Sequence, residues 1–305
     1  MRIVIFGSTG FLGSNLKLFF IKNGFEKFIF CDSINILQEK ELNEYIEKII
    51  PDIIINCCGI VGSSEMNKTL DEDEMFNKNF ILNMNILNCC KKNNIKRLIT
   101  FSSYRMFGEN INAFYNEEDI HSIYKIDNNA GYLLSKKMLD IQMQLFKKKH
   151  ATQIVCLILP NVFGCFDKFE INGRILPALI TKIENAKKKN EDLYLNTNAN
   201  NTVNLIYVED VFNIVNQCLT NDVSGNIIIF NRNGTYKLKE ISEKLKIILE
   251  YKKNIFFSEE IENCSNIINP DISKFDTFFK NYIFHDIENS LEVIKEFRSK
   301  LDDLY

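Results

Sequence analysis

The sequence predicts an α/β fold: a doubly wound parallel sheet followed by a smaller C-terminal α/β lobe. The strand candidates are continuous apolar runs without polar alternation, as in residues 2–6 (RIVIF) and 153–159 (QIVCLIL). Such runs are typical of strands that helices cover on both faces. Helical stretches separate them, so the order βαβα repeats. The length of 305 residues fits one large α/β domain or one domain with a further lobe.

The elements follow in order along the first half of the chain. A turn of Gly and Ser separates the first strand from the first helix, and the second helix ends before Pro51. The remaining strands are short runs of β-formers, and the remaining helices have the 3.6-residue period. We expect strands at 2–6, 28–31, 52–58, 97–102 and 153–159, and helices at 11–24, 39–50, 76–93 and 132–150.

The pattern becomes less regular after about Pro160. Shorter strand candidates at 193–195, 205–207 and 227–230 alternate with helix candidates at 175–188, 209–219, 238–250 and 287–304, and residues 258–275 look irregular. The sequence contains no repeat and no low-complexity linker. We therefore expect a cofactor-binding domain over residues 1–160 and a lobe over residues 161–305, with some chain crossing back to the sheet.

Composition excludes several classes of protein. Lys and Arg total 37 against 40 acidic residues, so the net charge of −3 gives no argument for a nucleic acid or an anionic membrane as partner. No signal-peptide pattern is present, and no apolar run approaches the roughly 18 residues of a membrane span. Nine cysteines without a CxxC, and only three His, argue against a disulfide framework and a metal site. We expect a cytoplasmic protein with reduced thiols.

A glycine motif lies between the first strand and the first helix. It reads Gly7-Ser8-Thr9-Gly10-Phe11-Leu12-Gly13, or GxxGxxG. Glycines allow a tight turn and a close approach to a pyrophosphate, and the helix N-terminus offers it free N–H groups. The motif therefore predicts a dinucleotide site, while an ordinary tight turn is the alternative.

An acidic residue, Asp32, ends the second strand. In dinucleotide-binding folds an acid at this place binds the ribose hydroxyls of NAD, whereas an Arg accepts the 2′-phosphate of NADP. Asp32 could equally cap the turn that follows it. NAD(H) and NADP(H) therefore both stay open.

Three further residues suggest proton chemistry. Ser102 ends the fourth strand, and Tyr132 and Lys136 are spaced i, i+4, which places them on one face of a helix. A nearby ammonium favours the phenolate, so Tyr132 becomes a usable proton donor and acceptor, and a Ser hydroxyl can bind a carbonyl oxygen. This set suits hydride transfer between a nicotinamide and a carbonyl carbon.

At this point the sequence resembles a known family. It is similar to the extended short-chain dehydrogenases/reductases, a Rossmann-fold superfamily, in the branch that acts on nucleotide sugars, and most of all to GDP-L-fucose synthases, which are epimerase/reductases. The similarity covers residues 1 to about 220. It rests on GSTGFLGS (7–14), CDSINIL (31–37), PDIIINCCGIVG (51–62), Asn79, FSSYRMFG (101–108), YLLSK (132–136), LPNVFG (159–164), NGRILPAL (172–179) and YVEDV (207–211).

The resemblance implies roles for individual residues. Ser102, Tyr132 and Lys136 would be catalytic. Further contacts to the dinucleotide would come from Cys57, Cys58, Gly59, Asn79, Pro160 and Val162. The nucleotide sugar would meet Ser103, Tyr104, Asn161, Arg174, Ile175 and Leu179. The resemblance also implies a homodimer through a four-helix bundle built from the helices at 76–93 and 132–150, whose apolar positions could equally be ordinary core.

The departures from the family are informative. The epimerase Cys corresponds to Tyr104 and the epimerase His to Arg174, and a guanidinium is a poor proton shuttle. The two NADPH-binding arginines correspond to Thr9 and Cys31, and an expected diphosphate-binding Arg is Val203. The sequence therefore predicts ketone reduction without epimerisation.

The resulting functional prediction is an NAD(P)H-dependent C4 reductase. Its substrate would be a nucleotide-linked 4-keto-6-deoxy sugar or heptose, with GDP as the nucleotide, in surface polysaccharide synthesis. A 4,6-dehydratase is disfavoured, because Tyr104-Arg105 stand where its acid pair would be. A nucleotide-sugar 4-epimerase or 4-dehydrogenase with tightly bound NAD shares the Ser/Tyr/Lys set and is the alternative. A non-enzymatic dinucleotide-binding protein is a third possibility.

Overall fold

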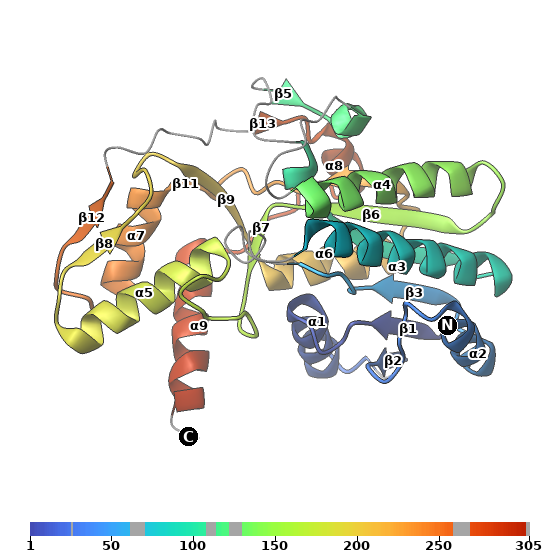
Figure 1. Ribbon diagram of the computed structural model, residues 1–305, viewed down its shortest axis with the longest axis horizontal. Coiled ribbons are helices and arrows are strands. Elements are labelled where there is room, and N and C mark those ends of the chain that lie inside the picture. Colours follow the sequence, from blue (N-terminus) through green and yellow to red (C-terminus); the bar gives the residue numbers. More distant parts are fainter. Residues whose placement is uncertain (26, 62–70, 108–113, 122–129, 259–268, 303–305) are drawn as a thin grey trace.

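The computed structural model contains a six-stranded sheet in which every neighbouring pair is parallel (Figure 1). It describes residues 1–25, 27–61, 71–107, 114–121, 130–258 and 269–302. The strand order is β10-β6-β4-β3-β1-β2. The strands are β1 (Ile3–Phe6), β2 (Phe28–Cys31), β3 (Ile53–Asn56), β4 (Arg97–Ser103), β6 (Gln153–Leu159) and β10 (Gly225–Ile228).

Alternate residues of β1 enter two separate cores. Ile3 and Ile5 of β1 belong to the core that includes Leu16 and Phe20, whereas Val4 and Phe6 belong to the opposite one. Both faces are apolar, so helices must cover both. Helices α1 (Phe11–Lys22) and α6 (Val208–Thr220) cover the first face, and α2 (Glu39–Ile49), α3 (Glu72–Lys92) and α4 (Ala130–Lys147) cover the second.

The later part of the chain forms a lobe beside the carboxyl ends of the strands (Figure 1). A three-stranded sheet joins it to the main sheet, in the order β11-β9-β7, with strands β11 (Thr235–Lys237), β9 (Thr202–Tyr207) and β7 (Asn161–Phe163). Around it lie helices α5 (Ile175–Lys189), α7 (Leu238–Ile248) and α9 (Ile287–Asp302), whereas α8 (Ser273–Phe278) contacts β10 of the main sheet. Two further sheets have two strands each: β12 (Ile255–Phe257) pairs with β8 (Leu193–Leu195), and β13 (Asn269–Pro270) pairs with β5 (Phe114–Tyr115).

The predicted fold class is confirmed, with local differences. The helix expected from residue 76 begins at Glu72, because the Asp71 side chain caps it by accepting from the backbone N–H groups of Asp73 and Glu74. Strands β5, β7, β11, β12 and β13 were not predicted; each has two or three residues, too few to show a period. Part of the expected irregular segment, residues 259–268, lies outside the described residues. The division of the chain into two domains at residue 160 stays a prediction. Elements from beyond residue 160 also belong to the first of them, because β10 and α6 lie with the main sheet.

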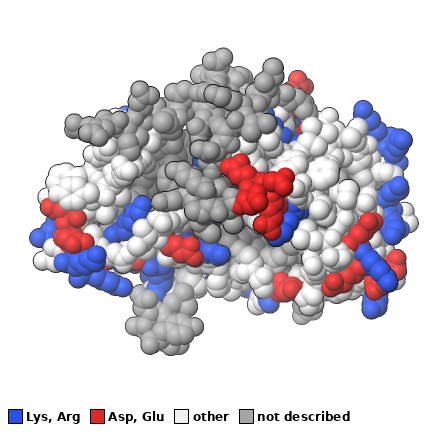
Figure 2. Space-filling model, viewed as in Figure 1, with Lys and Arg blue, Asp and Glu red and all other residues white. Residues whose placement is uncertain are grey.

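Charges of both signs are interspersed over the visible face of the molecule (Figure 2). A cluster of acidic side chains lies over the start of α3. Glu72, Asp73 and Glu74 occupy the first turn there, where negative charge interacts favourably with the positive end of the helix dipole. In the described part of the chain, no helix has both the length and the apolar character that crossing a membrane needs. Nor do the described residues include a cluster of metal-ligating side chains.

A buried polar junction fastens the C-terminal segment to α6. Asp210, whose side chain is fully buried, accepts hydrogen bonds from the Tyr282 hydroxyl at 2.9 Å and from the His285 backbone N–H at 3.2 Å. The His285 Nδ1 atom lies 2.8 Å from the same carboxylate. This bond to Asp210 raises the pKa of His285 above its ordinary value, although partial burial opposes the rise. The junction therefore ties the lobe to the helix layer of the main sheet.

The raised pKa of His285 makes stability depend on pH. Folding favours the protonated imidazole, so its stabilising contribution is fully present below the unfolded pKa of about 6.5 and is lost as the pH rises through the folded value. We expect the free energy of unfolding of the wild type to fall more between pH 6 and pH 8.5 than that of His285→Gln. Urea denaturation at both pH values measures this difference. Equal losses in the two proteins would contradict the assignment.

Candidate functional site

The glycine turn lies at the carboxyl edge of the sheet, where β1 meets α1. Gly7 has a φ of +76°, a conformation that favours glycine, and a Cβ at Gly7 would lie 2.8 Å from Cys58 Sγ. A Cβ at Gly13 would lie 2.1 Å from the Gly7 carbonyl oxygen. No side chain caps α1, whose N-cap is Gly10. The first-turn N–H groups of α1 therefore have no side-chain acceptor, which is the arrangement that an anion such as a pyrophosphate needs.

Asp32 lies beside this turn at the end of β2. Ser8, a buried residue of the turn, donates a hydrogen bond from its hydroxyl to the Asp32 carboxylate. The turn after β2 is instead capped by Asn35, whose side chain accepts from the Leu37 N–H at 3.1 Å. Asp32 itself is exposed. Its carboxylate is therefore held by the glycine turn and is open to a ligand.

The residues that follow β3 form the neighbouring wall. Asn79 of α3 accepts a hydrogen bond from the Ile60 N–H and donates one to the Ile60 carbonyl, both at 2.9 Å. This pairing fixes the backbone that carries Cys57, Cys58 and Gly59. Burial raises the pKa of Cys57 and raises that of Cys58 to about 12. Both side chains are therefore neutral thiols at ordinary pH, which suits a lining role and not a nucleophilic one.

Lys136 connects this wall to β4 and α4. Its ammonium donates to the Phe101 carbonyl at 3.2 Å and lies 5.6 Å from the centroid of the Tyr132 ring. A Cβ built on Gly59 would lie 3.8 Å from both Lys136 Nζ and Asn79 Oδ1. Lys136 is only 8% exposed. Little water therefore screens the interaction of its charge with neighbouring groups.

The other two predicted catalytic residues are Ser102, next to the Phe101 carbonyl that Lys136 contacts, and Tyr132, whose ring Lys136 approaches. Ser102, near the end of β4, donates from its hydroxyl to Met106 Sδ at 3.3 Å. A thioether is a weak acceptor, so this hydroxyl can exchange its partner for a carbonyl oxygen at little cost. The Tyr132 hydroxyl makes no hydrogen bond to any residue that the structure describes, including Ser102. The structure thus gathers the Ser, Tyr and Lys around one place without linking them directly.

Two of the predicted substrate residues contact each other. The Asn161 side-chain amide on β7 donates to the Tyr104 hydroxyl and to the Asn204 carbonyl, both at 3.2 Å. Ser103 accepts from the Arg105 N–H at 3.3 Å and so shapes the turn after β4. Pro160 and Val162, placed near the nicotinamide by the resemblance, are buried around the start of β7. The polar end of Tyr104 is therefore occupied by an amide and not by a base.

Arg174 is engaged by protein groups. Its guanidinium forms an ion pair with Asp167, donates to the Val162 carbonyl at 3.0 Å and lies over the Phe11 ring. A substrate contact for Arg174 stays a prediction. Within the described residues these contacts place it at the junction of the lobe and the glycine turn.

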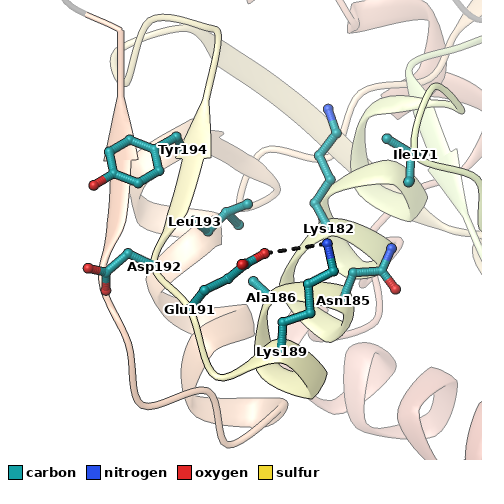
Figure 3. Close-up of a pocket in the computed structure, with 9 residues that line it drawn as sticks. All are labelled: Ile171, Lys182, Asn185, Ala186, Lys189, Glu191, Asp192, Leu193 and Tyr194. Atoms are coloured by element: carbon teal, nitrogen blue, oxygen red, sulfur yellow. Dashed lines mark ion pairs between the residues drawn. The ribbon is translucent and has the colours of Figure 1, made fainter.

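A hollow of about 590 Å³ lies between α5 and β8 (Figure 3). None of its lining residues was predicted. Ile175 and Leu179, which were, lie on the same face of α5 as the lining residues Lys182 and Ala186, because the spacing i, i+4, i+7 and i+11 keeps one side of a helix. The sequence signal that could have indicated the hollow is this helical period, followed along α5 as far as its lysine residues. The lining is Ile171, Lys182, Asn185, Ala186, Lys189, Glu191, Asp192, Leu193 and Tyr194.

The polar groups of the hollow differ in their pairing. Lys189 forms an ion pair with Glu191 at 3.6 Å, drawn as a dashed line in Figure 3. Lys182 makes no ion pair with any residue that the structure describes. Tyr194 of β8 is among the lining residues, but its ring points away from α5 (Figure 3) and stacks on Phe256, with ring centroids 5.0 Å apart. The hollow therefore offers one available cation.

These features define an α/β fold with a glycine turn at the carboxyl edge of its parallel sheet and with Ser102, Tyr132 and Lys136 on β4 and α4. The model of the NAD dependent epimerase/dehydratase family matches residues 3–231. The chain belongs to that family, whose members are NAD(P)-dependent enzymes of nucleotide sugars.

Individual relatives agree in fold at low identity. A GDP-L-fucose synthase of Dictyostelium discoideum is 22% identical over 262 residues, covering 84% of this chain and 82% of that protein. A GDP-L-fucose synthetase of Naegleria fowleri superposes with a TM-score of 0.89 at 20% identity, over 99% of this chain and 94% of that one. The GDP-mannoheptose C4 reductase of Campylobacter jejuni, with NADP bound, gives 0.85 at 16% identity over 98% of both chains.

Proposed function

We propose that the protein is an NAD(P)H-dependent C4 reductase of a nucleotide-linked 4-keto-6-deoxy sugar or heptose, without epimerase activity, in surface polysaccharide synthesis. The observation that carries the proposal is the position of Lys136. Its ammonium lies by the Tyr132 ring on one side and by Gly59 of the cofactor wall on the other. One cation is thereby placed to serve both the proton donor and the dinucleotide.

The protein's residues would divide the reaction between them. When bound, the nicotinamide supplies the hydride. Ser102 would exchange Met106 for the substrate carbonyl oxygen and polarise it. Tyr132 would give its phenolic proton to the oxygen as negative charge develops there, and Lys136 would stabilise the resulting phenolate.

Loss of epimerisation follows from the groups at two positions. Removing a proton next to a ketone needs a base, and returning it from the other face needs an acid. The Tyr104 hydroxyl is occupied by the Asn161 amide, which cannot take up a proton. Arg174 stays protonated and is paired with Asp167. Neither position offers a proton shuttle.

We place the nucleotide end of the substrate in the hollow between α5 and β8. Lys182 offers a cation for a diphosphate. GDP is the base we propose, because several of the similar proteins are named for GDP-linked sugars. We further propose a cytoplasmic location, in keeping with eight described cysteines that are all free thiols.

The first prediction concerns Tyr132. Tyr132→Phe removes the proton donor and keeps the ring, so we expect turnover of the keto sugar to fall by at least about 10²-fold. Dinucleotide binding should change less than about twofold, because the hydroxyl makes no described protein contact. Oxidation of NADH or NADPH at 340 nm and a fluorescence titration measure the two quantities. Near wild-type turnover would refute the mechanism.

The same preparation tests the alternative function. A 4-epimerase or 4-dehydrogenase would retain NAD through purification, visible as nucleotide absorbance in the isolated protein, and would interconvert sugars without added cofactor. Incubation with the keto sugar in heavy water tests the absence of epimerisation. Deuterium at a ring carbon next to the ketone would show that a proton shuttle exists.

We propose NAD(H) as the preferred cofactor. A 2′-phosphate would meet the Asp32 carboxylate, which Ser8 holds in place beside the glycine turn. Within the described residues no Lys or Arg forms an ion pair with Asp32. The groups around it are the Cys31 and Cys58 thiols and the Tyr45 phenol, and burial raises the pKa of each. A dianionic phosphate therefore has no described partner there.

This proposal predicts a preference of about tenfold or more for NADH over NADPH in dissociation constant. Asp32→Ser should weaken the binding of NADH, because a contact to the ribose is lost. It should leave the binding of NADPH unchanged or make it tighter, because the repulsion between the carboxylate and the 2′-phosphate is also removed. Fluorescence titration with each dinucleotide measures the change. Asp271→Ser, a partly buried acid two residues before the start of α8, is the matched control. Equal affinity of the wild type for both dinucleotides would contradict the proposal.

We also propose a homodimer formed through α3 and α4. The two helices pack side by side, and the Gln142 amide of α4 donates to the Phe80 carbonyl of α3 at 3.3 Å. Their outer face carries large apolar side chains that are 38–60% exposed: Ile81, Met84, Ile141 and Leu145. Two copies of such a face can form a four-helix bundle and bury these groups.

Charged substitutions test the dimer. We expect the double variant Ile141→Glu, Leu145→Glu to be monomeric in multi-angle light scattering and the wild type to have twice the mass of one chain, because buried carboxylates oppose association. Ile247→Glu on α7, where Ile247 is 77% exposed, is the control and should leave the mass unchanged. A monomeric wild type would exclude this interface.

A further inference from the structure

Arg174 occupies the residue before α5, and three of its contacts fix its guanidinium within the lobe. Nε donates to Asp167 Oδ1 at 3.2 Å, and Nη2 donates to Oδ2 of the same carboxylate. Nη1 donates to the Val162 carbonyl on β7 at 3.0 Å. A two-point Arg–carboxylate pair has a defined plane, unlike a single lysine contact. The guanidinium plane is therefore set by the lobe.

The carboxylate that holds Arg174 is unusually buried. The Asp167 side chain is 2% exposed, whereas that of Arg174 is 37% exposed. Burial raises the pKa of Asp167 even though Arg174 opposes the rise. A buried carboxylate that loses its partner is strongly destabilised, so this pair stays closed in the folded protein.

The fourth contact crosses to the cofactor site. The guanidinium carbon of Arg174 lies 4.1 Å from the centroid of the Phe11 ring, within stacking distance. Phe11 is the first residue of α1 and follows Gly10 of the glycine turn directly. It is only partly buried, and no side chain caps the helix there. We infer that Arg174 is a positioning residue that holds the glycine turn and the first turn of α1 in place for the dinucleotide.

This inference rests on the proposed dinucleotide function, and it replaces a substrate contact with a different role for the same side chain. The position that supplies a proton shuttle in the epimerases would here join the substrate lobe to the phosphate cradle. The stack would set the direction of the first N–H groups of α1 before a ligand arrives. Pre-positioned donors lower the cost of binding an anion.

The protein contains a matched control for the experiment. Arg298 of α9 donates from Nε to Glu184 Oε1 at 3.1 Å and from Nη2 to Oε2. Its guanidinium carbon lies 4.0 Å from the centroid of Phe169. The same three-part arrangement, Arg on a carboxylate and over a Phe, thus occurs within the lobe and away from the glycine turn. Arg298→Met removes an equivalent ion pair and an equivalent stack.

The test compares Arg174→Met with Arg298→Met in the full chain. Dissociation constants for NADH and for NADPH come from nicotinamide fluorescence, and melting temperatures come from circular dichroism. We expect Arg174→Met to weaken the dinucleotide that the wild type prefers by about tenfold, and Arg298→Met to change it less than about twofold. A merely structural role would lower both melting temperatures and leave both affinities alone.

Two further variants separate positioning from simple charge attraction. Arg174→Lys keeps the charge and loses the planar fork, so it should bind about as weakly as Arg174→Met. Phe11→Leu removes the ring beneath the guanidinium and should cause a similar loss, and it serves on its own if Arg174→Met does not fold. Full rescue by Lys, unchanged affinity in Phe11→Leu, or unchanged affinity in Arg174→Met would each overturn the inference. A wild type that binds neither dinucleotide would instead overturn the proposed function.

Discussion

The structure depends on burying the main sheet on both faces. Strands β1 and β3 are wholly apolar apart from Asn56, and their alternate side chains enter opposite cores. Such strands are stable only under two helix layers, and parallel neighbours need a crossover between them. Every crossover leaves the sheet at the same edge. The glycine turn, Asp32 and Gly59 follow three different strands, and Ser102 lies near the end of a fourth, so all of them lie at this edge.

The same constraint explains what could be predicted from the sequence. Continuous apolar runs and 3.6-residue periods indicate the parallel sheet directly, and residues at strand ends inherit their place from it. The i, i+4 spacing of Tyr132 and Lys136 places both on one helix face before any coordinates exist. These signals are local, so sequence reasoning finds them.

The remaining features depend on contacts between distant segments. Asn161 meets Tyr104, and Arg174 meets Phe11, although 57 and 163 residues separate the partners. No period or motif connects such pairs, because the lobe brings them together only after it has folded. The hollow between α5 and β8 was missed for a related reason: both elements were predicted, but no sequence pattern shows that they face each other. The Asp210 junction also joins two segments far apart in the sequence, which neither segment reveals alone.

The two positions that depart from the epimerases acquire a common physical explanation. A proton shuttle needs a group that can lose and regain a proton at the substrate. At Tyr104 the hydroxyl is bound by an amide, and at Arg174 the guanidinium is committed to a carboxylate, a carbonyl and a ring. In the proposed function, both side chains hold structure and neither moves a proton. The reduction that we propose would rely on Ser102, Tyr132 and Lys136 and would need neither of them.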